Sequence, residues 1–126
     1  MTDPYVEQKK KTLDPYKIKN NKIERGKSYP PHLVTDSEVI YKGEWMNGEP
    51  HGVGELFFQD GSYFYGTFAN GFVHGEGRFI SNNHSYYEGQ VRHNKAEGRG
   101  IWVNDEENYQ YNGEWANDLP NGEGRE

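Results

Sequence analysis

The sequence predicts an all-β fold, a thin antiparallel sheet of about four hairpin repeats with the last one incomplete, preceded by an extended N-terminal arm. The first observation is a phrase of aromatic residues and glycines that returns every 23 residues from Tyr41 onwards, as from Gly43 to Gly66 and Gly89. Such self-similarity indicates a repeat architecture. The second is composition: with 32% hydrophobic and 15% aromatic residues, the chain has too little aliphatic material for a thick two-layer core.

Each copy of the phrase is typical of a β-hairpin. In the first copy Tyr41-Lys42-Gly43-Glu44-Trp45 alternates as a strand does, and Asn47-Gly48 is a tight-turn signal. A second strand is expected through Gly52, Gly54 and Leu56, ending at the turn signal Asp60-Gly61-Ser62. Two strands and two turns therefore fit within one period.

Four copies divide residues 38–126 into repeats at 41–63, 64–86, 87–110 and 111–126. The third copy lacks the tryptophan, and the fourth is set one residue late by an insertion near Asp105-Glu106-Glu107. Because the fourth copy has only its first half, we expect its last strand to lack a hairpin mate and to leave an open sheet edge. A partner protein could complete that edge by strand addition, or the repeats could belong to a larger enzyme.

The glycines predict how the rings pack. Glycine is poor in strands except where something approaches the backbone closely, so we expect rings of one strand to lie over glycines of its neighbours. The glycines assigned this structural role are Gly43, Gly52, Gly54, Gly66, Gly75, Gly77, Gly89, Gly98, Gly100, Gly113, Gly122 and Gly124. Stacked copies would align three columns: Tyr41, Phe64, Tyr87 and Tyr111; Trp45, Phe68, Val91 and Trp115; Leu56, Phe79 and Trp102. We predict that the aromatic members of these columns form a protein-interaction surface.

These features resemble the MORN repeat (membrane occupation and recognition nexus). Its consensus joins aromatic-x-Gly-x-aromatic, Gly, His-Gly-x-Gly and Asp-Gly-Ser, and residues 41–63 match it almost throughout. In residues 64–86 Asn83-His84-Ser85 replaces Asp-Gly-Ser, and the later copies match more loosely. The resemblance implies an elongated single-layer sheet that serves as a scaffold or attachment surface. Family members occur in ciliary radial spokes and other cytoskeletal assemblies, at membrane junctions and in plant phosphatidylinositol phosphate kinases.

Residues 1–37 form a basic polar segment that we expect to be extended or disordered. They hold eight Lys and Arg against five Asp and Glu, a balance of +3, whereas residues 38–126 hold six against fifteen, a balance of −9. Asp3-Pro4-Tyr5 recurs as Asp14-Pro15-Tyr16, either by chance or as a docking element. As docking residues, Tyr5 and Tyr16 would anchor the arm while Lys9, Lys10 and Lys11 meet an acidic surface.

Candidate catalytic and metal sites give way to simpler interpretations. His51 and His74 occupy equivalent places in successive hairpins, about 9.5 Å apart, which is too far to share one zinc ion; we interpret them as hydrogen-bonding turn residues. Glu44, Glu88 and Glu114 fall on the face opposite the rings, as a solvated face. The chain contains no cysteine, and no triad or phosphate-binding motif assembles. We therefore expect no enzyme activity, no cofactor and no metal.

The sequence thus predicts a structural module that binds other proteins of a large assembly. The acidic sheet disfavours nucleic acid as a partner. Attachment to membranes or phosphoinositides is the alternative function, and it ranks second because anionic lipids would repel the acidic sheet. No apolar run resembles a signal peptide or a membrane helix. From this and the family resemblance we expect a cytoplasmic, cytoskeletal location, with the ciliary axoneme first.

Overall fold

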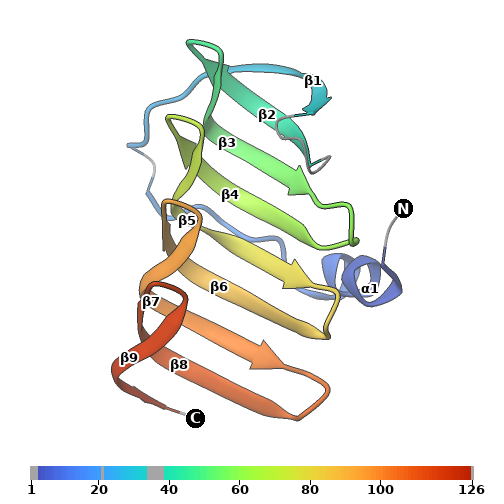
Figure 1. The fold of residues 1–126 in the computed structure, drawn as a ribbon, viewed down its shortest axis with the longest axis vertical. Helices are drawn as coiled ribbons and strands as arrows, with labels where there is room; N and C mark the ends of the chain where they lie inside the picture. The colour runs from blue at the N-terminus through green and yellow to red at the C-terminus, as the bar shows by residue number, and fades with distance from the viewer. Residues whose placement is uncertain (1–2, 21, 34–38, 126) are drawn as a thin grey trace.

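A computed structural model describes residues 3–20, 22–33 and 39–125 of the protein. Within them nine strands form one antiparallel sheet in which the strand order follows the chain order, so the sheet is a single-layer meander (Figure 1). One helix, α1, precedes it. The elements are α1 Pro4–Thr12, β1 Lys27–Leu33, β2 Ile40–Met46, β3 Glu49–Phe57, β4 Tyr63–Ala69, β5 Phe72–Ser81, β6 Ser85–Arg92, β7 Lys95–Asn104, β8 Tyr109–Ala116 and β9 Leu119–Arg125. The predicted all-β, single-layer fold is confirmed.

Each repeat is one hairpin closed by a two-residue turn. Asn47 and Gly48 have φ angles of 53° and 78°, both left-handed, as a type I′ turn requires. The same arrangement recurs at Asn70-Gly71, His93-Asn94 and Asn117-Asp118. The fourth repeat is no exception, because β9 pairs with β8. The prediction that its strand lacks a hairpin mate is therefore wrong: a whole hairpin fits within residues 109–125.

The turns also tie successive hairpins together. The amide of Gly71 donates to the carbonyl of Pro50 at 3.0 Å, which extends the ladder of hydrogen bonds beyond the end of the strands. Asn94 and Asp118 repeat this bond, donating to Val73 and Ala96. Their side chains also accept bonds from the amides of the same two residues, at 2.8 and 2.6 Å.

A row of glycines crosses the sheet in register. Gly43 pairs with Gly54, Gly54 with Gly66, and the row continues through Gly77, Gly89, Gly100, Gly113 and Gly124. A parallel row begins with Tyr41 and Leu56 and continues through Phe64, Phe79, Tyr87, Trp102 and Tyr111. Two of the three predicted columns are thus alternate members of one row.

The rings lie over the glycine row, as predicted. A methyl group at Gly54 would overlap the ring of Tyr41, and one at Gly66 would lie 2.7 Å from Cζ of Phe64. The Tyr41 hydroxyl crosses the glycine row and donates to the carbonyl of Glu44. Tyr87 and Tyr111 repeat this bond to Gln90 and Glu114, at 2.6 and 2.9 Å. The bare backbone therefore provides the site in which the ring lies.

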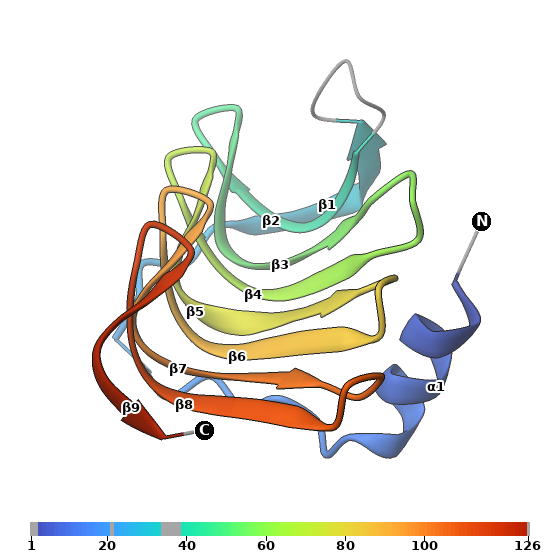
Figure 2. The same cartoon turned by 60° about the horizontal axis from the view of Figure 1, so that its bottom comes forward.

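Irregular pairing bends every hairpin at the same place. Gly43 pairs with Gly54 and Trp45 pairs with Pro50, so an advance of two residues along β2 corresponds to four residues along β3. Similar shifts follow Gly66, Gly89 and Gly113, and such irregularities bend strands. The sheet becomes a trough, with the arm and α1 on its outer side (Figure 2). We call the inner, ring-bearing face the concave face and the outer one the convex face.

The first glycine of His-Gly-x-Gly lies at this bend. Gly52 has a φ of 97°, and a methyl group there would overlap the carboxylate of Glu44. That carboxylate accepts from the amide of Val53 at 3.1 Å. In the next two repeats Thr67 and Gln90 accept in the same way from Glu76 and Arg99. Glycine is required here by both backbone conformation and space.

The N-terminal segment differs from the extended or disordered arm that the sequence predicted. Asp3 caps α1 through its carboxylate, which accepts from the amides of Tyr5 and Val6, and β1 pairs with β2 as an edge strand. The segment cannot bury enough apolar surface alone, but the sheet supplies that surface: Tyr5 and Val6 are buried against it. Residues 34–38, with the predicted boundary between arm and sheet, lie outside the described residues.

We predict that Gly54→Ala lowers the free energy of unfolding by about 2–4 kcal/mol, because the added methyl group overlaps the ring of Tyr41. Urea denaturation followed by tryptophan fluorescence measures this. The control is Gly48→Ala, where a methyl group meets nothing within 4 Å and only the strain of φ 78° remains, a cost of about 1–2 kcal/mol. Equal losses in the two variants would contradict ring-over-glycine packing.

Candidate interaction surfaces

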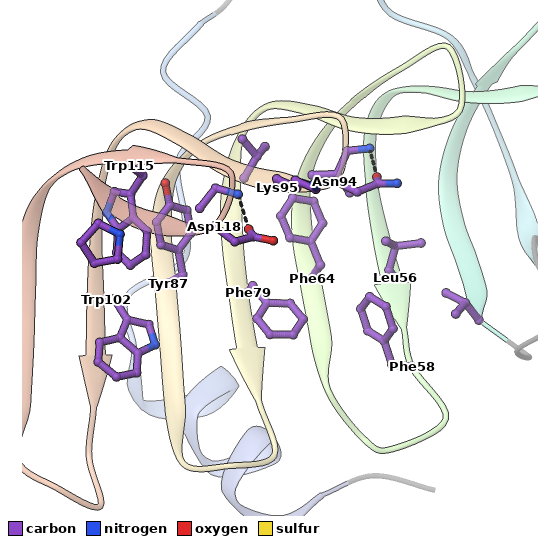
Figure 3. A pocket seen from close by; sticks show the side chains of 15 residues that line it. Leu56, Phe58, Phe64, Phe79, Tyr87, Asn94, Lys95, Trp102, Trp115 and Asp118 are labelled. Atoms are coloured by element: carbon purple, nitrogen blue, oxygen red, sulfur yellow. Dashed lines mark hydrogen bonds between the residues drawn. The ribbon is translucent and has the colours of Figure 1, made fainter. Parts of the chain in front are cut away.

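The concave face holds an apolar groove of about 780 Å³. Its floor is the row of aromatic and aliphatic side chains, and its wall comes from the hairpin ends (Figure 3). Among its fifteen lining residues only Lys95 and Asp118 carry charge, and both stand at hairpin turns. The groove is lined by Val39, Leu56, Phe58, Phe64, Val73, Phe79, Tyr87, Val91, Asn94, Lys95, Ala96, Trp102, Trp115, Asp118 and Pro120.

Most of the predicted interaction residues are core rather than free surface. Rings of the column that contains Phe68 pack edge to face against rings of the column that contains Tyr41. Phe68 contacts Tyr41 and Phe64 at centroid distances of 4.9 and 5.7 Å. Trp115 does the same between Tyr87 and Tyr111, at 5.2 and 5.3 Å. All six rings are buried. The partly exposed members of the predicted columns are Trp45, Leu56, Phe79 and Trp102, so the accessible surface is narrower than the sequence predicted.

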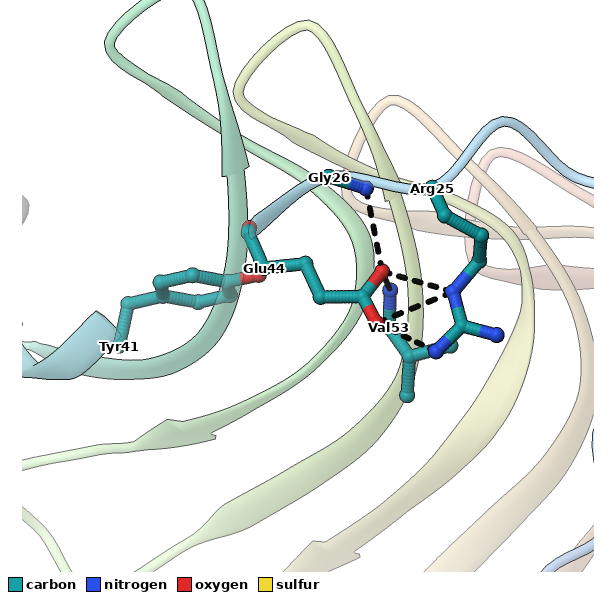
Figure 4. A network of polar contacts seen from close by, with 5 residues as sticks. All are labelled: Arg25, Gly26, Tyr41, Glu44 and Val53. Carbon is teal, nitrogen blue, oxygen red and sulfur yellow. Dashed lines mark hydrogen bonds and ion pairs between the residues drawn. The ribbon is translucent and has the colours of Figure 1, made fainter. Parts of the chain in front are cut away.

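The convex face is polar at its bends, and the arm covers it there. At the first repeat Arg25 forms a forked ion pair with Glu44, with its Nε 2.8 and 3.0 Å from the two carboxylate oxygens (Figure 4). The amide of Gly26 donates to the same carboxylate at 3.3 Å. Hydrogen bonds from Arg25, and then from backbone amides, hold the pKa of Glu44 below its usual range. Glu44 is only 8% exposed, so the prediction of a solvated carboxylate here is wrong.

A second carboxylate clamps the arm at the next repeat. Glu76 accepts from the hydroxyl of Tyr16 at 2.8 Å and from the amides of Lys19 and Asn20 at 2.7 and 3.0 Å. Burial and the bond to Glu76 raise the pKa of Tyr16. Arg78 donates to the carbonyl of Asp14 at 2.7 Å. The extended stretch of the arm is thus fixed to the middle of the sheet.

Helix α1 covers an apolar patch near the loops at the other end of the strands. Tyr5 and Val6 pack with Tyr63 and Ile80, flanked by Phe57, Tyr65 and Tyr86. Asp105 accepts from the Tyr5 hydroxyl and pairs with Lys9, both at 2.8 Å. Burial opposes ionisation of Asp105, but the bonds from Lys9 and Tyr5 prevail and lower its pKa. The partners foreseen for Tyr5, Tyr16 and Lys9 are therefore carboxylates of the chain's own sheet.

Lys10 lies over the ring of Tyr63, 4.0 Å from its centroid, which is a cation–π contact. Lys11 is exposed. Of the three consecutive lysines predicted to dock, Lys9 and Lys10 therefore contact the sheet of their own chain, and only Lys11 points away from it.

The histidines behave as structural residues. His51 is buried; its Nε2 lies 2.9 Å from Glu24 and its Nδ1 accepts from the amide of Asn70 at 3.3 Å. It therefore links the arm, its own hairpin and the next turn, as expected of a hydrogen-bonding residue. The ring of His74 is exposed and lies 5.8 Å from that of His93. Among the described residues no group of three or more His, Cys, Asp or Glu is placed to hold a metal ion.

The comparison with protein families agrees with this geometry. The MORN repeat model matches residues 41–63, 64–86, 87–106 and 111–126, which together make up more than half of the chain. The protein belongs to the MORN-repeat family. Its third match ends at residue 106, inside the loop between β7 and β8 where the insertion lies. MORN repeats are a non-catalytic module that generally mediates interactions with proteins or membranes. Within the described part of this MORN-repeat protein, no helix is long and apolar enough to cross a membrane.

The sequence did not reveal the arm's contacts. Arg25, Glu24 and Glu76 are single charged residues in polar surroundings, and nothing in the spacing of this MORN-repeat protein pairs them with residues 19 to 60 positions away. One available signal was position: Glu44, Thr67 and Gln90 all stand one residue before the end of the repeated aromatic phrase, and all three have side-chain acceptors.

We predict that Glu44→Gln destabilises the protein by about 1–2 kcal/mol at pH 7, because it removes a charge-assisted bond to a partly exposed arginine. The folded pKa of Glu44 is depressed, so its contribution is present above the unfolded value of about 4.3 and is lost as pH falls through the folded value. The difference between variant and wild type should therefore shrink from pH 5 to pH 3 in urea titrations.

The matched control is Glu114→Gln. Glu114 occupies the equivalent position in the fourth repeat but is 43% exposed and 3.2 Å from an exposed Arg99, so its loss should change stability by no more than about 0.5 kcal/mol. A pH-independent deficit in the Glu44 variant would contradict the assignment.

Proposed function

We propose that the protein is a non-catalytic scaffold that binds a partner protein through the apolar groove of its concave face. The observation that carries the proposal is the unbroken row of apolar side chains from Leu56 to Trp102 along its floor. Aromatic side chains of this kind are the residue type enriched at the centres of protein interfaces. Phe79 and Trp102 are its accessible members.

The floor favours a helix as the bound element. Strands β3 to β8 are paired on both sides, so the groove offers no backbone groups to an extended peptide, whose own N–H and C=O groups would be left unsatisfied. An α-helix satisfies its backbone internally. Five strand spacings separate β3 from β8, about 24 Å, which about 16 helical residues would span. A partner helix with one apolar face therefore fits the groove.

Charge favours protein over lipid. Residues 38–126 carry a balance of six basic against fifteen acidic residues, which anionic headgroups repel. Of the three consecutive lysines of the arm that could approach a membrane, Lys9 and Lys10 contact Asp105 and Tyr63 of the chain itself, and Lys11 is exposed. Flotation with phosphoinositide vesicles, described below, tests phosphoinositide attachment as the alternative function.

We propose further that the partner is part of a cytoskeletal assembly. Among such assemblies we favour the ciliary axoneme and its radial spokes. The support is the resemblance to family members found there, which is an associational argument. Strand addition at the outer edge of β9 is a second way in which the same assembly could hold the sheet.

We predict that a photo-crosslinking amino acid at Phe79 captures one partner in living cells, whereas the same group at Gln110, exposed on the convex side of β8, does not. With that partner purified, Trp102→Ala should weaken binding at least tenfold, because truncation of a central interface ring costs about 2 kcal/mol or more. Gln110→Ala should leave binding unchanged. Isothermal titration measures both.

Equal capture at both positions would contradict the groove as the binding site. Flotation of the full chain with phosphoinositide vesicles tests the alternative: salt-sensitive binding that persists in the Trp102 variant would overturn the ranking of protein over lipid.

The proposed location predicts that the protein co-purifies with isolated cilia and stays with the axonemal pellet after detergent extraction. Quantitative mass spectrometry of these fractions measures it. Absence from both cilia and the wider cytoskeletal fraction would contradict the proposed location. It would leave the proposal that the groove binds a partner unaffected.

A further inference from the structure

The apolar patch beneath α1 is a second candidate binding surface, on the face opposite the groove. Phe57, Tyr63, Tyr65 and Tyr86 gather there around Ile80, which is 0% exposed. Elsewhere on the convex face, the arm contacts that the structure describes are mainly polar bonds to carboxylates and Arg78. A ring-rich patch on a polar face indicates a place where something docks. In this chain the docked element is α1 (Figure 2).

The hold of α1 on this patch is slight. The helix has nine residues, a length that is marginal in water without tertiary support. Only Tyr5 and Val6 are buried. Its polar contacts with the sheet are mainly those of Tyr5 and Lys9 with Asp105, a loop residue whose side chain is 34% exposed. Exposed pairs of this kind contribute little and weaken with salt.

The rest of the arm is fixed independently of α1. Tyr16, Lys19 and Asn20 hold Glu76, and Arg25 holds Glu44. Helix α1 can therefore leave the patch while the arm from Tyr16 onwards stays in place, with the connection at Leu13-Asp14-Pro15 between them. The helix is tethered close to its site, so it competes by high effective concentration rather than by intrinsic affinity.

The contacts of α1 specify what the patch recognises. A tyrosine hydroxyl and a lysine amine, one helical turn apart, both bind Asp105. The Tyr5 ring stacks on His84 at 4.7 Å between centroids, with the two planes 9° apart. A second lysine lies over the ring of Tyr63. The pattern is a short basic helix with tyrosine and a small aliphatic residue in its first turn.

We propose that this patch binds a short basic helix of a partner protein and that α1 is a displaceable autoinhibitory latch that occupies it in cis. A partner helix with the same contacts and a longer apolar edge would displace α1 and gain access to Tyr63, Ile80 and Asp105. Because the patch and the groove lie on opposite faces, the inference stands or falls separately from the proposed function.

The test measures how a separate peptide with the sequence of α1 binds to full-length protein. A fluorescent peptide of residues 3–13 is titrated by anisotropy against the double variant Tyr5→Ala/Val6→Asp, in which the patch is intact and α1 has lost its anchors. We expect saturable binding that weakens by about two- to fivefold when Asp105→Asn is added, because exposed pairs of this kind contribute about 0.5–1 kcal/mol. Wild type and Lys11→Ala, which alters an exposed residue of α1, should bind at least about 30-fold more weakly than the double variant, because their own helix fills the patch.

A second variant guards against misfolding of the first. Gln8→Pro breaks α1 at an exposed position and leaves the sheet unaltered, so it should bind the peptide as the double variant does. Failure of both folded variants to bind, or equal binding by wild type, would overturn the proposal. A wild-type dimer in which α1 of one copy cross-links to the patch of the other would also overturn it, because α1 would then be exchanged between copies.

Discussion

The packing of one aromatic ring over a pair of cross-strand glycines is the contact on which the rest of this molecule depends. A single-layer sheet cannot bury side chains against a second layer, so it must obtain its core from its own backbone. Tyr41, Phe64 and Tyr87 do this by lying over Gly54, Gly77 and Gly100. The interlocking of Trp115 and Phe68 with these rings then follows, and with it the apolar floor of the groove.

The bend of each hairpin gives the two faces different chemistry. At the bend the side chain of Glu44 turns to the outside and binds a backbone amide, while the ring of Tyr41 stays inside and binds the carbonyl of the same Glu44. Apolar groups accordingly collect on the concave face, and hydrogen-bonding groups lie along the convex one. The groove is a product of that division, whereas the apolar patch under α1 is an exception to it on the convex face.

The repeats could be read from the sequence because their determinants are local. The Asn47-Gly48 turn needs two left-handed residues in succession, and the glycine rows recur at a fixed spacing. The arm could not be read in this way. The bond from Tyr16 to Glu76 joins residues 60 positions apart, and α1 becomes stable only because Tyr63 and Ile80 present a surface that folds later in the chain.

The predicted interaction surface was too broad for a related physical reason. Strand alternation places Tyr41, Phe68 and Trp115 on one face, but alternation cannot say which of them the others cover. Edge-to-face contacts bury these rings, whereas Phe79 and Trp102 remain partly open. The fourth hairpin escaped prediction because its second strand needs only Leu119–Arg125 to pair with β8.

The bonds that tie each turn to the preceding hairpin have a mechanical consequence. Gly71, Asn94 and Asp118 each attach one hairpin to its neighbour at the very end of the ladder, where a pull across the sheet would load first. Such a stack would yield one hairpin at a time, and each repeat of about 23 residues would release roughly 80 Å of chain. The sheet would then lengthen in steps under tension, and each step would remove one hairpin from the floor of the groove.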